Sequence, residues 1–441
     1  MSFFMSCTLF PPTNLRWLFF DLNSFFASVE QQHDPKLRDR PVAVVPCLTN
    51  SSCVIAASYE AKAFGIKTGT NIGEARKLCP QLVCVTGQHD LYTRYHHKIM
   101  QSVGSVIPID KVYSIDEAAC RLLNNEQSLE QARRIAGDIK TALHDQVGAY
   151  VRCSIGIAGN VFLAKTASDM QKPDGLVILE AHNYRERLKA LALKDLTGIG
   201  RSIEQRLMQA GIYSVEQLLA LDPKHARKIW GSVAGEIFWY RLHGYDILDR
   251  PTQRRMFGHS RVLEPRHRNL TDAALITQNL LYKASTRLRQ SGHYARKMYL
   301  GVRFIKNSSS LYSQEPRMNF NSYSWLRDIS FSPSDDSIFF VKTLQALWAQ
   351  MQDQMQGRRL LKVSIALYDL QEKRHVTPDL FARLPAQRRS KLENEQLNMA
   401  VGKIQQRYGR KSILYGSCPR TDGGFLGTKI AFTRIPERDE F

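Results

Sequence analysis

Three carboxylates in two short stretches have the types and spacing of a metal-dependent phosphoryl-transfer site. Asp21 ends an apolar run that begins at Trp17, and Asp116 and Glu117 stand side by side about ninety residues later. Carboxylates from neighbouring strands can hold two divalent cations about 4 Å apart, an arrangement that suits in-line phosphoryl transfer. An isolated Asp-Glu pair is usually a solvated turn, so the interpretation depends on the surrounding elements.

The segments around these carboxylates must bring them together from separate strands. Residues 17–21 are aromatic and aliphatic, as in a buried strand, and 111–123 is strand-like around the Asp-Glu pair. Successive side chains on a regular strand face opposite ways, so Asp116 and Glu117 can converge only at a bend or a hairpin. We expect a split ferredoxin-like layer with helices packed on one face of the sheet. The helices are predicted at 25–32, 91–106, 128–145 and 160–170, and a further strand at 150–157.

The charge balance indicates a polyanionic partner. The chain of 441 residues carries a formal net charge of +20, and it is long enough for three or more domains. Between Arg250 and Lys306 there are thirteen Lys and Arg residues, opposed only by Glu264 and Asp272. A surface of one sign this dense repels itself unless an anion neutralises it. The pattern favours nucleic acid and predicts strongly salt-dependent binding.

Cysteine usage and hydropathy argue against several other classes of protein. The eight cysteines include no Cys-x-x-Cys pair, so we expect no zinc site, no disulfide framework and a reducing compartment. The sequence has no run of eighteen apolar residues, so we expect no membrane span. The apolar start, residues 1–10, lacks the basic region and the cleavage site of a signal peptide.

A glycine pair further along the chain suggests a second contact with nucleic acid. Gly198-Ile199-Gly200 joins two helical runs, and another helix is predicted at 214–221. The pattern resembles a helix-hairpin-helix, in which glycines let backbone N–H groups approach a DNA phosphate without a Cβ in the way. A plain turn between two helices is the alternative.

In their order along the chain, these motifs resemble those of the Y-family translesion DNA polymerases. The matching segments are Asp21-Leu22-Asn23-Ser24-Phe25-Phe26, Ser58-Tyr59-Glu60-Ala61-Lys62, Ser114-Ile115-Asp116-Glu117-Ala118, Ser154-Ile155-Gly156-Ile157-Ala158, Leu163-Ala164-Lys165 and Lys172-Pro173-Asp174-Gly175. The resemblance covers about residues 15–370. The extension beyond it looks more like the polymerase V catalytic subunit (UmuC) branch than the shorter polymerase IV (DinB) branch. The family often has Arg where Lys62 stands and Asp where Asn23 stands, and the polymerase V branch tolerates both changes.

The resemblance implies a two-metal active site and a nucleotide pocket. Asp21, Asp116 and Glu117 would ligate two Mg²⁺ ions, together with the backbone carbonyl of Leu22. The residues implied to bind the incoming nucleotide are Ser24, Phe25, Phe26, Tyr59, Lys62 and Lys172. Among them, Phe26 would be the steric gate, a ring that excludes the 2′-OH of a ribonucleotide. The alternative for Phe25 is a place in the core.

The resemblance also implies a multidomain α/β (α+β) fold of the right-hand polymerase type. The implied domains are a ferredoxin-like palm (15–30 and 84–180), small fingers (31–83), a helix-hairpin-helix thumb (181–245), a DNA-binding little finger (252–370) and a C-terminal extension (371–441). The expected DNA contacts are Gly198, Gly200, Arg254, Arg255, Arg261 and Arg303. In the extension, Leu380 and Phe381 are expected to bind a sliding clamp. The alternative there is an ordinary, partly buried Leu-Phe pair.

The predicted function is template-directed, low-fidelity translesion DNA synthesis, in DNA damage tolerance and SOS mutagenesis. Primer–template DNA and dNTPs would be the substrates, with a sliding clamp, a UmuD-like subunit and a recombinase filament as further partners. The expected location is the bacterial cytoplasm, on the nucleoid. One alternative is a non-catalytic DNA-binding scaffold, against which the three carboxylates argue. The other is a nucleotide cyclase, which would have no use for the basic C-terminal domain.

Overall fold

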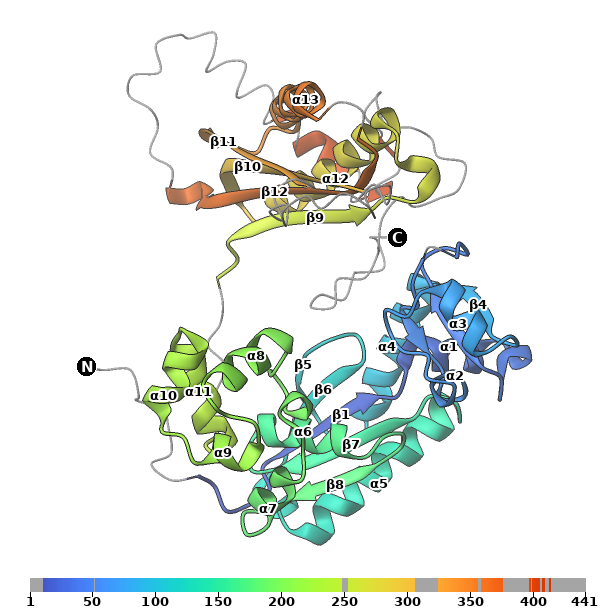
Figure 1. Cartoon of the computed structure of the whole chain (residues 1–441), viewed down its shortest axis with the longest axis vertical. Coiled ribbons are helices and arrows are strands. Elements are labelled where there is room, and N and C mark those ends of the chain that lie inside the picture. Colours follow the sequence, from blue (N-terminus) through green and yellow to red (C-terminus); the bar gives the residue numbers. More distant parts are fainter. Residues whose placement is uncertain are drawn as a thin grey trace, which may run out of the picture. The chain divides into compact units, whose positions relative to one another are not determined.

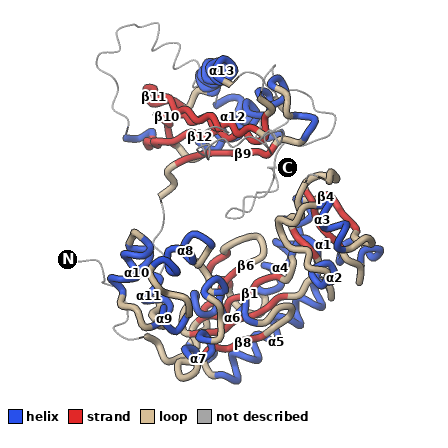
Figure 2. The backbone as a smooth tube through the Cα atoms, in the orientation of Figure 1, coloured by secondary structure: helices blue, strands red, loops and turns tan. Residues whose placement is uncertain are grey.

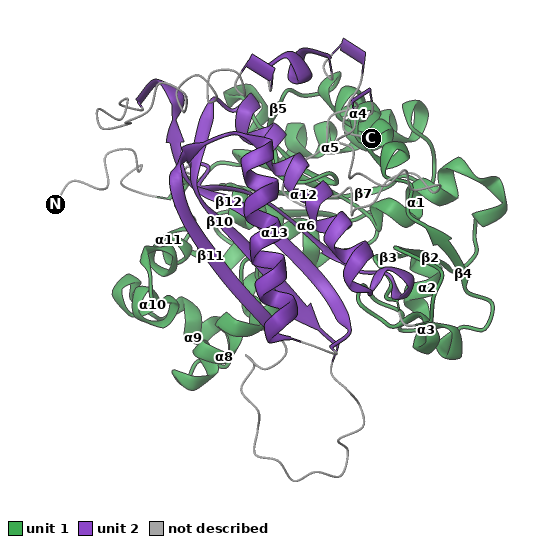
Figure 3. Ribbon diagram, turned by 90° about the horizontal axis from the view of Figure 1, so that it is seen from above, with its two compact units in different colours: residues 1–250, 430–438 green, residues 251–429, 439–441 purple. Residues whose placement is uncertain are grey.

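The computed structural model describes residues 11–50, 52–247, 253–305, 324–355 and 358–375, with short pieces between 396 and 413. Those up to residue 247 lie in one compact unit, and those from residue 253 lie in a second (Figures 1 and 3). Each unit has its own sheet and its own hydrophobic core. The predicted carboxylates all belong to the first unit.

A five-stranded sheet with β1 (Trp17–Leu22) at its centre carries the predicted site. β1 pairs antiparallel with β6 (Glu117–Arg121) on one side and with β7 (Cys153–Ala158) on the other. β5 (Ile109–Val112) extends the sheet beyond β6, and β8 (Leu176–Leu179) runs parallel to β7 at the opposite edge. The resulting order is β5-β6-β1-β7-β8, and the strands are the red segments of the tube in Figure 2.

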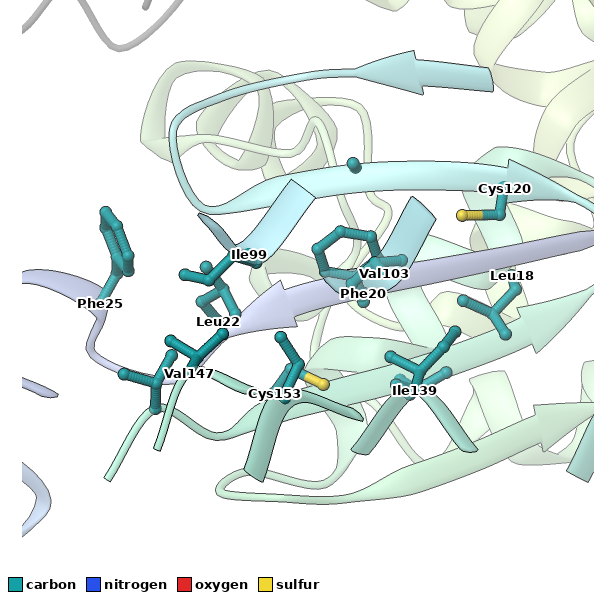
Figure 4. Packing of buried hydrophobic residues seen from close by; sticks show 14 of the residues in the cluster. Leu18, Phe20, Leu22, Phe25, Ile99, Val103, Cys120, Ile139, Val147 and Cys153 are labelled. Carbon is teal, nitrogen blue, oxygen red and sulfur yellow. The ribbon is translucent and has the colours of Figure 1, made fainter. Parts of the chain in front are cut away.

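Two long helices cover one face of this sheet. Leu18, Phe20 and Leu22 of β1 lie in one buried cluster with side chains of α4 (His89–Gly104) and α5 (Leu129–Gln146), as Figure 4 shows. α4 corresponds to the helix predicted at 91–106, and α5 to the helix predicted at 128–145. Their apolar stripes meet the apolar side chains that alternate along β1.

A third helix, α6 (Val161–Met170), covers the opposite face, so the expectation of helices on a single face was wrong. Trp17 and Phe19 belong to a second core, to which α6 contributes. Every residue of β1 is buried, and a strand that is apolar on both faces needs a cover on both. Glycine permits the close approach of α6, since a Cβ at Gly156 of β7 would lie 2.0 Å from the carbonyl oxygen of Ala164.

A smaller sheet with two short helices is inserted into the chain between β1 and β5. β2 (Val42–Val45) pairs antiparallel with β3 (Ala56–Ala57) and parallel with β4 (Val83–Thr86). Helices α2 (Tyr59–Ala63) and α3 (Ile72–Leu78) share a small separate core with this sheet. The chain leaves the large sheet after β1, forms the small sheet, and returns to the large sheet at β5.

Short helices follow β8 in the first unit. They are α7 (Tyr184–Lys189), α8 (Arg201–Gln209), α9 (Val215–Leu219), α10 (Pro223–Trp230) and α11 (Val233–Leu242). Leu207, Leu218 and Phe238 join them to the same core as α6. Gly198 has a φ of 90°, which favours glycine, and Gly200 is the N-cap residue of α8. The helix predicted at 214–221 is α9.

The second unit is an antiparallel four-stranded sheet with two helices packed on one face. Its strands, in the order β11-β10-β12-β9, are β11 (Ser324–Ser334), β10 (His293–Phe304), β12 (Leu360–Glu372) and β9 (Met256–Val262). Helices α12 (Leu270–Gln290) and α13 (Ser337–Gln354) enclose a core that includes Phe257, Met298 and Phe340. Side chains that alternate with the core residues of the strands point to the other face.

The cysteines within the described ranges are all unpaired. They are Cys47, Cys53, Cys79, Cys84, Cys120 and Cys153. Three of them, Cys79, Cys120 and Cys153, are buried in the cores. Of the helices in those ranges, none combines the length and the apolar character needed to cross a bilayer.

Candidate active site

A hairpin brings the three predicted carboxylates to one end of the large sheet. Asp21 lies near the end of β1, directly opposite Glu117, the first residue of β6. Asp116 lies in the turn between β5 and β6, which is closed by a hydrogen bond from the N–H of Tyr113 to the carbonyl oxygen of Glu117 at 2.9 Å. The strand expected at 111–123 is therefore two strands with a turn between them. This turn is the bend that convergence of Asp116 and Glu117 requires.

Burial raises the pKa values of two of these carboxyl groups. Asp21 is only 9% exposed, and burial raises its pKa to about 7, although the neighbouring Lys172 ammonium acts to lower it. Burial also raises the pKa of Asp116, and the charge of Glu117 adds to the rise. The Ser114 hydroxyl opposes it by donating to Asp116 Oδ1 at 2.5 Å. Buried carboxylates that repel one another are stabilised by nearby positive charge.

Two lysine side chains contact these carboxylates. Lys172 Nζ lies 2.7 Å from Asp21 Oδ1 and 2.8 Å from Asp169 Oδ1. Lys165 forms an ion pair with Glu117 and also lies over the ring of Phe19, 4.9 Å from its centroid. In the described part of the chain, no three acidic, histidine or cysteine side chains are already grouped as metal ligands. Asp21 and Glu117 pair instead with lysines, and Asp116 accepts from Ser114.

Two of the predicted nucleotide-binding residues lie beside Lys172. Tyr59 begins α2, whose N-cap residue Ser58 accepts a hydrogen bond from the N–H of Ala61 at 3.3 Å. Lys62 Nζ lies over the Tyr59 ring, 4.2 Å from its centroid. Partial desolvation lowers the pKa of Lys62, and the nearby Lys172 ammonium lowers it further. The two lysines therefore form one cationic group close to Asp21.

Helix α1 (Phe25–His33) places both predicted phenylalanines against α4. The Phe26 ring stacks on Tyr92, with centroids 4.5 Å apart, and Phe25 meets the same ring edge-on at 6.4 Å. The Tyr92 hydroxyl donates to Glu30 Oε1 at 2.5 Å. Both phenylalanines are buried and belong to the same core cluster as Tyr92. Sequence reasoning placed Tyr92 only in the apolar stripe of a helix and did not single out Glu30.

The turn between β1 and α1 carries two more of the expected residues. The N–H of Leu22 donates to the carbonyl oxygen of Asp116 at 2.9 Å, which ties the end of β1 to the hairpin turn. Ser24 takes a left-handed conformation with a φ of 51°. Its hydroxyl is buried and lies close to the Tyr59 hydroxyl. Left-handed backbone at a residue with a Cβ is strained, and such strain is common at ligand sites.

Asn23 has a role that sequence reasoning did not anticipate. Its Nδ2 donates to Ser154 Oγ at 3.0 Å, and its Oδ1 accepts from the N–H of Asp174 at 2.7 Å. An aspartate could not donate the first of these bonds. Asn23 therefore joins β1 to the segment that carries Lys172, and the signal for it was the departure from the family pattern at this position.

Comparison with known proteins identifies the family. Residues 20–169 match the model of the impB/mucB/samB family, and residues 254–380 match that of the impB/mucB/samB family C-terminal domain. The DNA polymerase IV of Moorella thermoacetica is 34% identical, over 64% of this chain and 72% of the relative. That of Pelotomaculum thermopropionicum is 30% identical, over 89% and 93%. The solved Y-family DNA polymerase chimera Dbh-Dpo4(243-245)-Dbh matches with a TM-score of 0.65 at 21% identity, over 81% of this chain and 99% of that one. The chain belongs to the Y-family of translesion DNA polymerases.

This membership confirms the main expectations from the sequence. The protein is a DNA-directed DNA polymerase with the mixed α/β fold of its family, which acts on primer–template DNA and dNTPs. The names of the relatives favour the polymerase over the scaffold and the cyclase. Both relatives are named DNA polymerase IV, so the closer likeness to the polymerase V branch stays a prediction.

The donor set at the carboxylates fits the two divalent ions that Y-family polymerases use, typically Mg²⁺. Asp21, Asp116 and Glu117 supply carboxylate oxygens, the ligands that Mg²⁺ prefers in proteins. Asp21 lies on β1 and Glu117 on the adjacent strand β6, and Asp116 lies in the turn that joins β5 to β6. Burial raises the pKa values of Asp21 and Asp116, and divalent cations would stabilise the ionised forms of both carboxyl groups.

The face of the polymerase's four-stranded sheet that lies opposite α12 and α13 carries basic side chains. Arg303 of β10 is exposed and lies opposite Lys362 of β12. Lys297, six residues before Arg303 on the same strand, points to the same face. Sequence reasoning counted Lys297 only within a basic block and missed Lys362. The signal that could have found both is the period of two along each strand.

Arg261 lies on the other face of that sheet, contrary to the expectation that it contacts DNA. It pairs in register with Val363, whose side chain belongs to the core. Arg261 is 8% exposed, and its Nη2 donates to Glu264 Oε1 at 3.3 Å. The charge density of the segment concealed this placement, because composition does not say which face a strand residue occupies.

The remaining expected contacts lie at the ends of elements or outside the described ranges. Arg254 and Arg255 are exposed just before β9, and the Arg254 guanidinium lies 5.0 Å from the centroid of the Phe257 ring. Leu380 and Phe381, the expected clamp contacts, lie outside the described residues.

Proposed function

We propose that Asp21, Asp116 and Glu117, with the backbone carbonyl of Leu22, hold the two Mg²⁺ ions of this translesion polymerase. The observation that carries the proposal is the position of Asp21 opposite Glu117 on adjacent strands, with Asp116 in the adjoining turn. When bound, the ions would lower the pKa of the primer 3′-OH and neutralise charge on the triphosphate. The chain's own part is to bury and orient the oxygens that hold them.

Primer extension with four dNTPs, on intact and abasic templates, tests this assignment. Asp116→Ala/Glu117→Ala should reduce extension by about a thousandfold or more, while DNA binding measured by fluorescence anisotropy stays unchanged. Asp138→Asn, a change at an exposed carboxylate of α5, is the matched control and should extend primers normally. Extension that survives in the double variant would refute the assignment. Replicative accuracy on the intact template would refute low fidelity.

The triphosphate is proposed to bind at Tyr59, Lys62 and Lys172. The support is the cationic group that the two lysines form beside Asp21. Lysine supplies a point charge without the bidentate geometry of arginine, so the site relies on charge and on the tyrosine ring. Phe26 is proposed as the steric gate, with Ser24 and Phe25 beside it. Its place in the first turn of α1, directly after the proposed metal-binding strand, supports this role.

The domain plan of the family is proposed for the two units. The large sheet with α4, α5 and α6 would be the palm (15–30 and 84–180), and the small sheet would be the fingers (31–83). The short helices from α7 onward would be the thumb (181–245). The second unit would be the little finger (252–370), followed by the extension (371–441). The separate cores of the small sheet and of the second unit support the plan.

DNA backbone contacts are proposed at the basic face and at the glycine turn. Arg303, Lys297 and Lys362 share one face, and Arg254 and Arg255 precede the same sheet. Contacts of this kind to phosphates are independent of sequence, as a polymerase requires. The positive φ of Gly198 and the N-cap position of Gly200 support a phosphate contact before α8.

A place in DNA damage tolerance is proposed together with several partners. Leu380 and Phe381 would bind a sliding clamp, and a UmuD-like subunit and a recombinase filament would join in SOS mutagenesis. The bacterial relatives support a cytoplasmic location on the nucleoid. A pull-down with purified clamp tests the first of these contacts. Leu380→Ala/Phe381→Ala should abolish capture, and full capture of this variant would disprove the contact.

A further inference from the structure

Lys172 lies between two carboxylates with different surroundings. Its Nζ is 2.7 Å from Asp21 Oδ1 and 2.8 Å from Asp169 Oδ1. Asp21 is buried at the end of β1, whereas the side chain of Asp169 is 37% exposed in the last turn of α6. Asp21 is one of the proposed metal ligands, and Asp169 is not. The ammonium therefore bridges the proposed metal site and a carboxylate outside it.

The backbone on both sides of Lys172 is held in place. Before it, α6 packs closely on β7, and this helix carries Asp169. After it, the N–H of Asp174 donates to Asn23 Oδ1 at 2.7 Å. The ammonium can therefore move only as far as its own side chain allows. The Lys62 ammonium, which is also proposed to bind the triphosphate, lies close to the Lys172 ammonium and repels it.

We propose that Asp169 is the positioning residue that holds Lys172 ready for the triphosphate, an inference that rests on the proposed role of Lys172. A divalent cation on Asp21 competes with the Lys172 ammonium for the same carboxylate. Asp169 does not bind that cation, so it keeps its ion pair with the Lys172 ammonium and holds it beside the metal site. An ammonium has three N–H donors, so one can stay on Asp169 while the others meet phosphate oxygens.

Equilibrium binding of a correct dNTP on a dideoxy-terminated primer, in Mg²⁺, tests the inference without catalysis. Asp169→Asn should raise the dNTP Kd about 2–5-fold, as expected for the loss of one partly exposed ion pair. Asp169→Glu keeps the charge and should recover most of the affinity. In steady-state assays, Asp169→Asn should raise KM more than it lowers kcat. Asp138→Asn, the exposed control on α5, should leave Kd and KM unchanged.

A second readout follows Lys172 itself. Acetic anhydride acetylates lysines whose ammonium loses its proton readily and is accessible. With Mg²⁺ present, mass spectrometry should find Lys172 acetylated about 2–5-fold faster in Asp169→Asn than in wild type, in proportion to the ion pair that is lost. Equal rates of acetylation in the two proteins would overturn the inference.

Lys172→Ala separates the inference from the proposed function on which it rests. If Lys172→Ala weakens dNTP binding and Asp169→Asn does not, the role of Asp169 is wrong and that of Lys172 stands. If neither change alters Kd, both roles fall. The double variant Asp169→Asn/Lys172→Ala should bind no more weakly than Lys172→Ala alone, because Asp169 acts only through Lys172. Additive losses would overturn the inference.

Discussion

The ring of Tyr92 stacks on the ring of Phe26, with centroids 4.5 Å apart and planes inclined by 25°. The Tyr92 hydroxyl is held in turn by Glu30 Oε1 at 2.5 Å, and Gln88 Nε2 donates to Glu30 Oε2 at 3.0 Å. Phe26 and Glu30 are one turn apart on α1. The proposed steric gate thus rests on a tyrosine that its own helix fixes in place.

Removal of the Tyr92 ring should weaken the discrimination against ribonucleotides. In Tyr92→Leu, we expect the ratio of dNTP to rNTP kcat/KM to fall about tenfold, and in Phe26→Ala to fall further. Tyr92→Phe keeps the stacked ring and should keep the discrimination. Its free energy of unfolding should fall by about 1–3 kcal/mol, because the buried Glu30 loses a donor. Loss of discrimination as large in Tyr92→Phe as in Tyr92→Leu would contradict a role for stacking.

The pair of Lys165 with Glu117 predicts a response to metal removal. Lys165→Ala should lower the Tm in EDTA, by an amount that corresponds to about 1 kcal/mol, because the carboxylates lose a counter-charge. Added Mg²⁺ should stabilise the variant more than wild type, since the ion replaces that charge. Scanning fluorimetry with an Mg²⁺ titration measures both effects. Lys189→Ala on α7 is the control, and a response to Mg²⁺ as small in Lys165→Ala as in this control would rule the idea out.

Because β7 and α6 are in close contact, a methyl group added at Gly156 should strongly destabilise the protein. A Cβ at Gly156 would lie 2.0 Å from the Ala164 carbonyl oxygen, so Gly156→Ala should lower the free energy of unfolding by about 3 kcal/mol. Gly137 of α5 has no atom within 4 Å of such a Cβ. Gly137→Ala should therefore stabilise the protein by about 0.5–1 kcal/mol. Urea titrations should show these opposite signs, and equal effects would contradict the packing.

The buried His96 side chain should make the protein less stable to unfolding at acidic pH. Burial lowers its pKa below the ordinary 6.5, and its Nδ1–H donates to the Ile115 carbonyl at 2.7 Å. The unfolded chain therefore binds a proton at this residue at a higher pH than the folded protein does. The contribution is complete above about pH 6.5 and is lost as the pH falls towards the lower folded pKa. His96→Gln should show a smaller fall in unfolding free energy between about pH 7.5 and 5.5, and an unchanged fall would disprove this origin.

The two faces of the second unit's sheet predict different results for two arginines. Arg303→Ala should weaken DNA binding and reduce the slope of log K against log salt by about 1. Arg261→Ala should leave that slope unchanged and lower stability instead, because it removes a buried partner of Glu264. Anisotropy titrations at several salt concentrations measure the slope. A reduced slope for Arg261→Ala would show that Arg261 does contact DNA.

Much of the site was readable in the sequence because short motifs carry their own local geometry. The apolar strand that ends in Asp21 and the need for a bend at Asp116 and Glu117 both follow from the period of two along a strand. The helix predicted at 128–145 is α5, which has Ser128 as its N-cap residue. The cover on both faces of the large sheet was missed, although the unbroken apolar character of β1 contains that information.

By itself the sequence determined the residue types and the family: three carboxylates, the lysines proposed to bind the nucleotide, and a basic second half. Only the tertiary structure decided which partners these side chains have. Lys172 and Asp169, Tyr92 and Phe26, and Asn23 and Asp174 are joined by packing between separate elements. Arg261 was placed in the core by the register of β9 on β12. Local patterns set the residue types and the period of an element, but its register and facing are set by contacts distant along the chain.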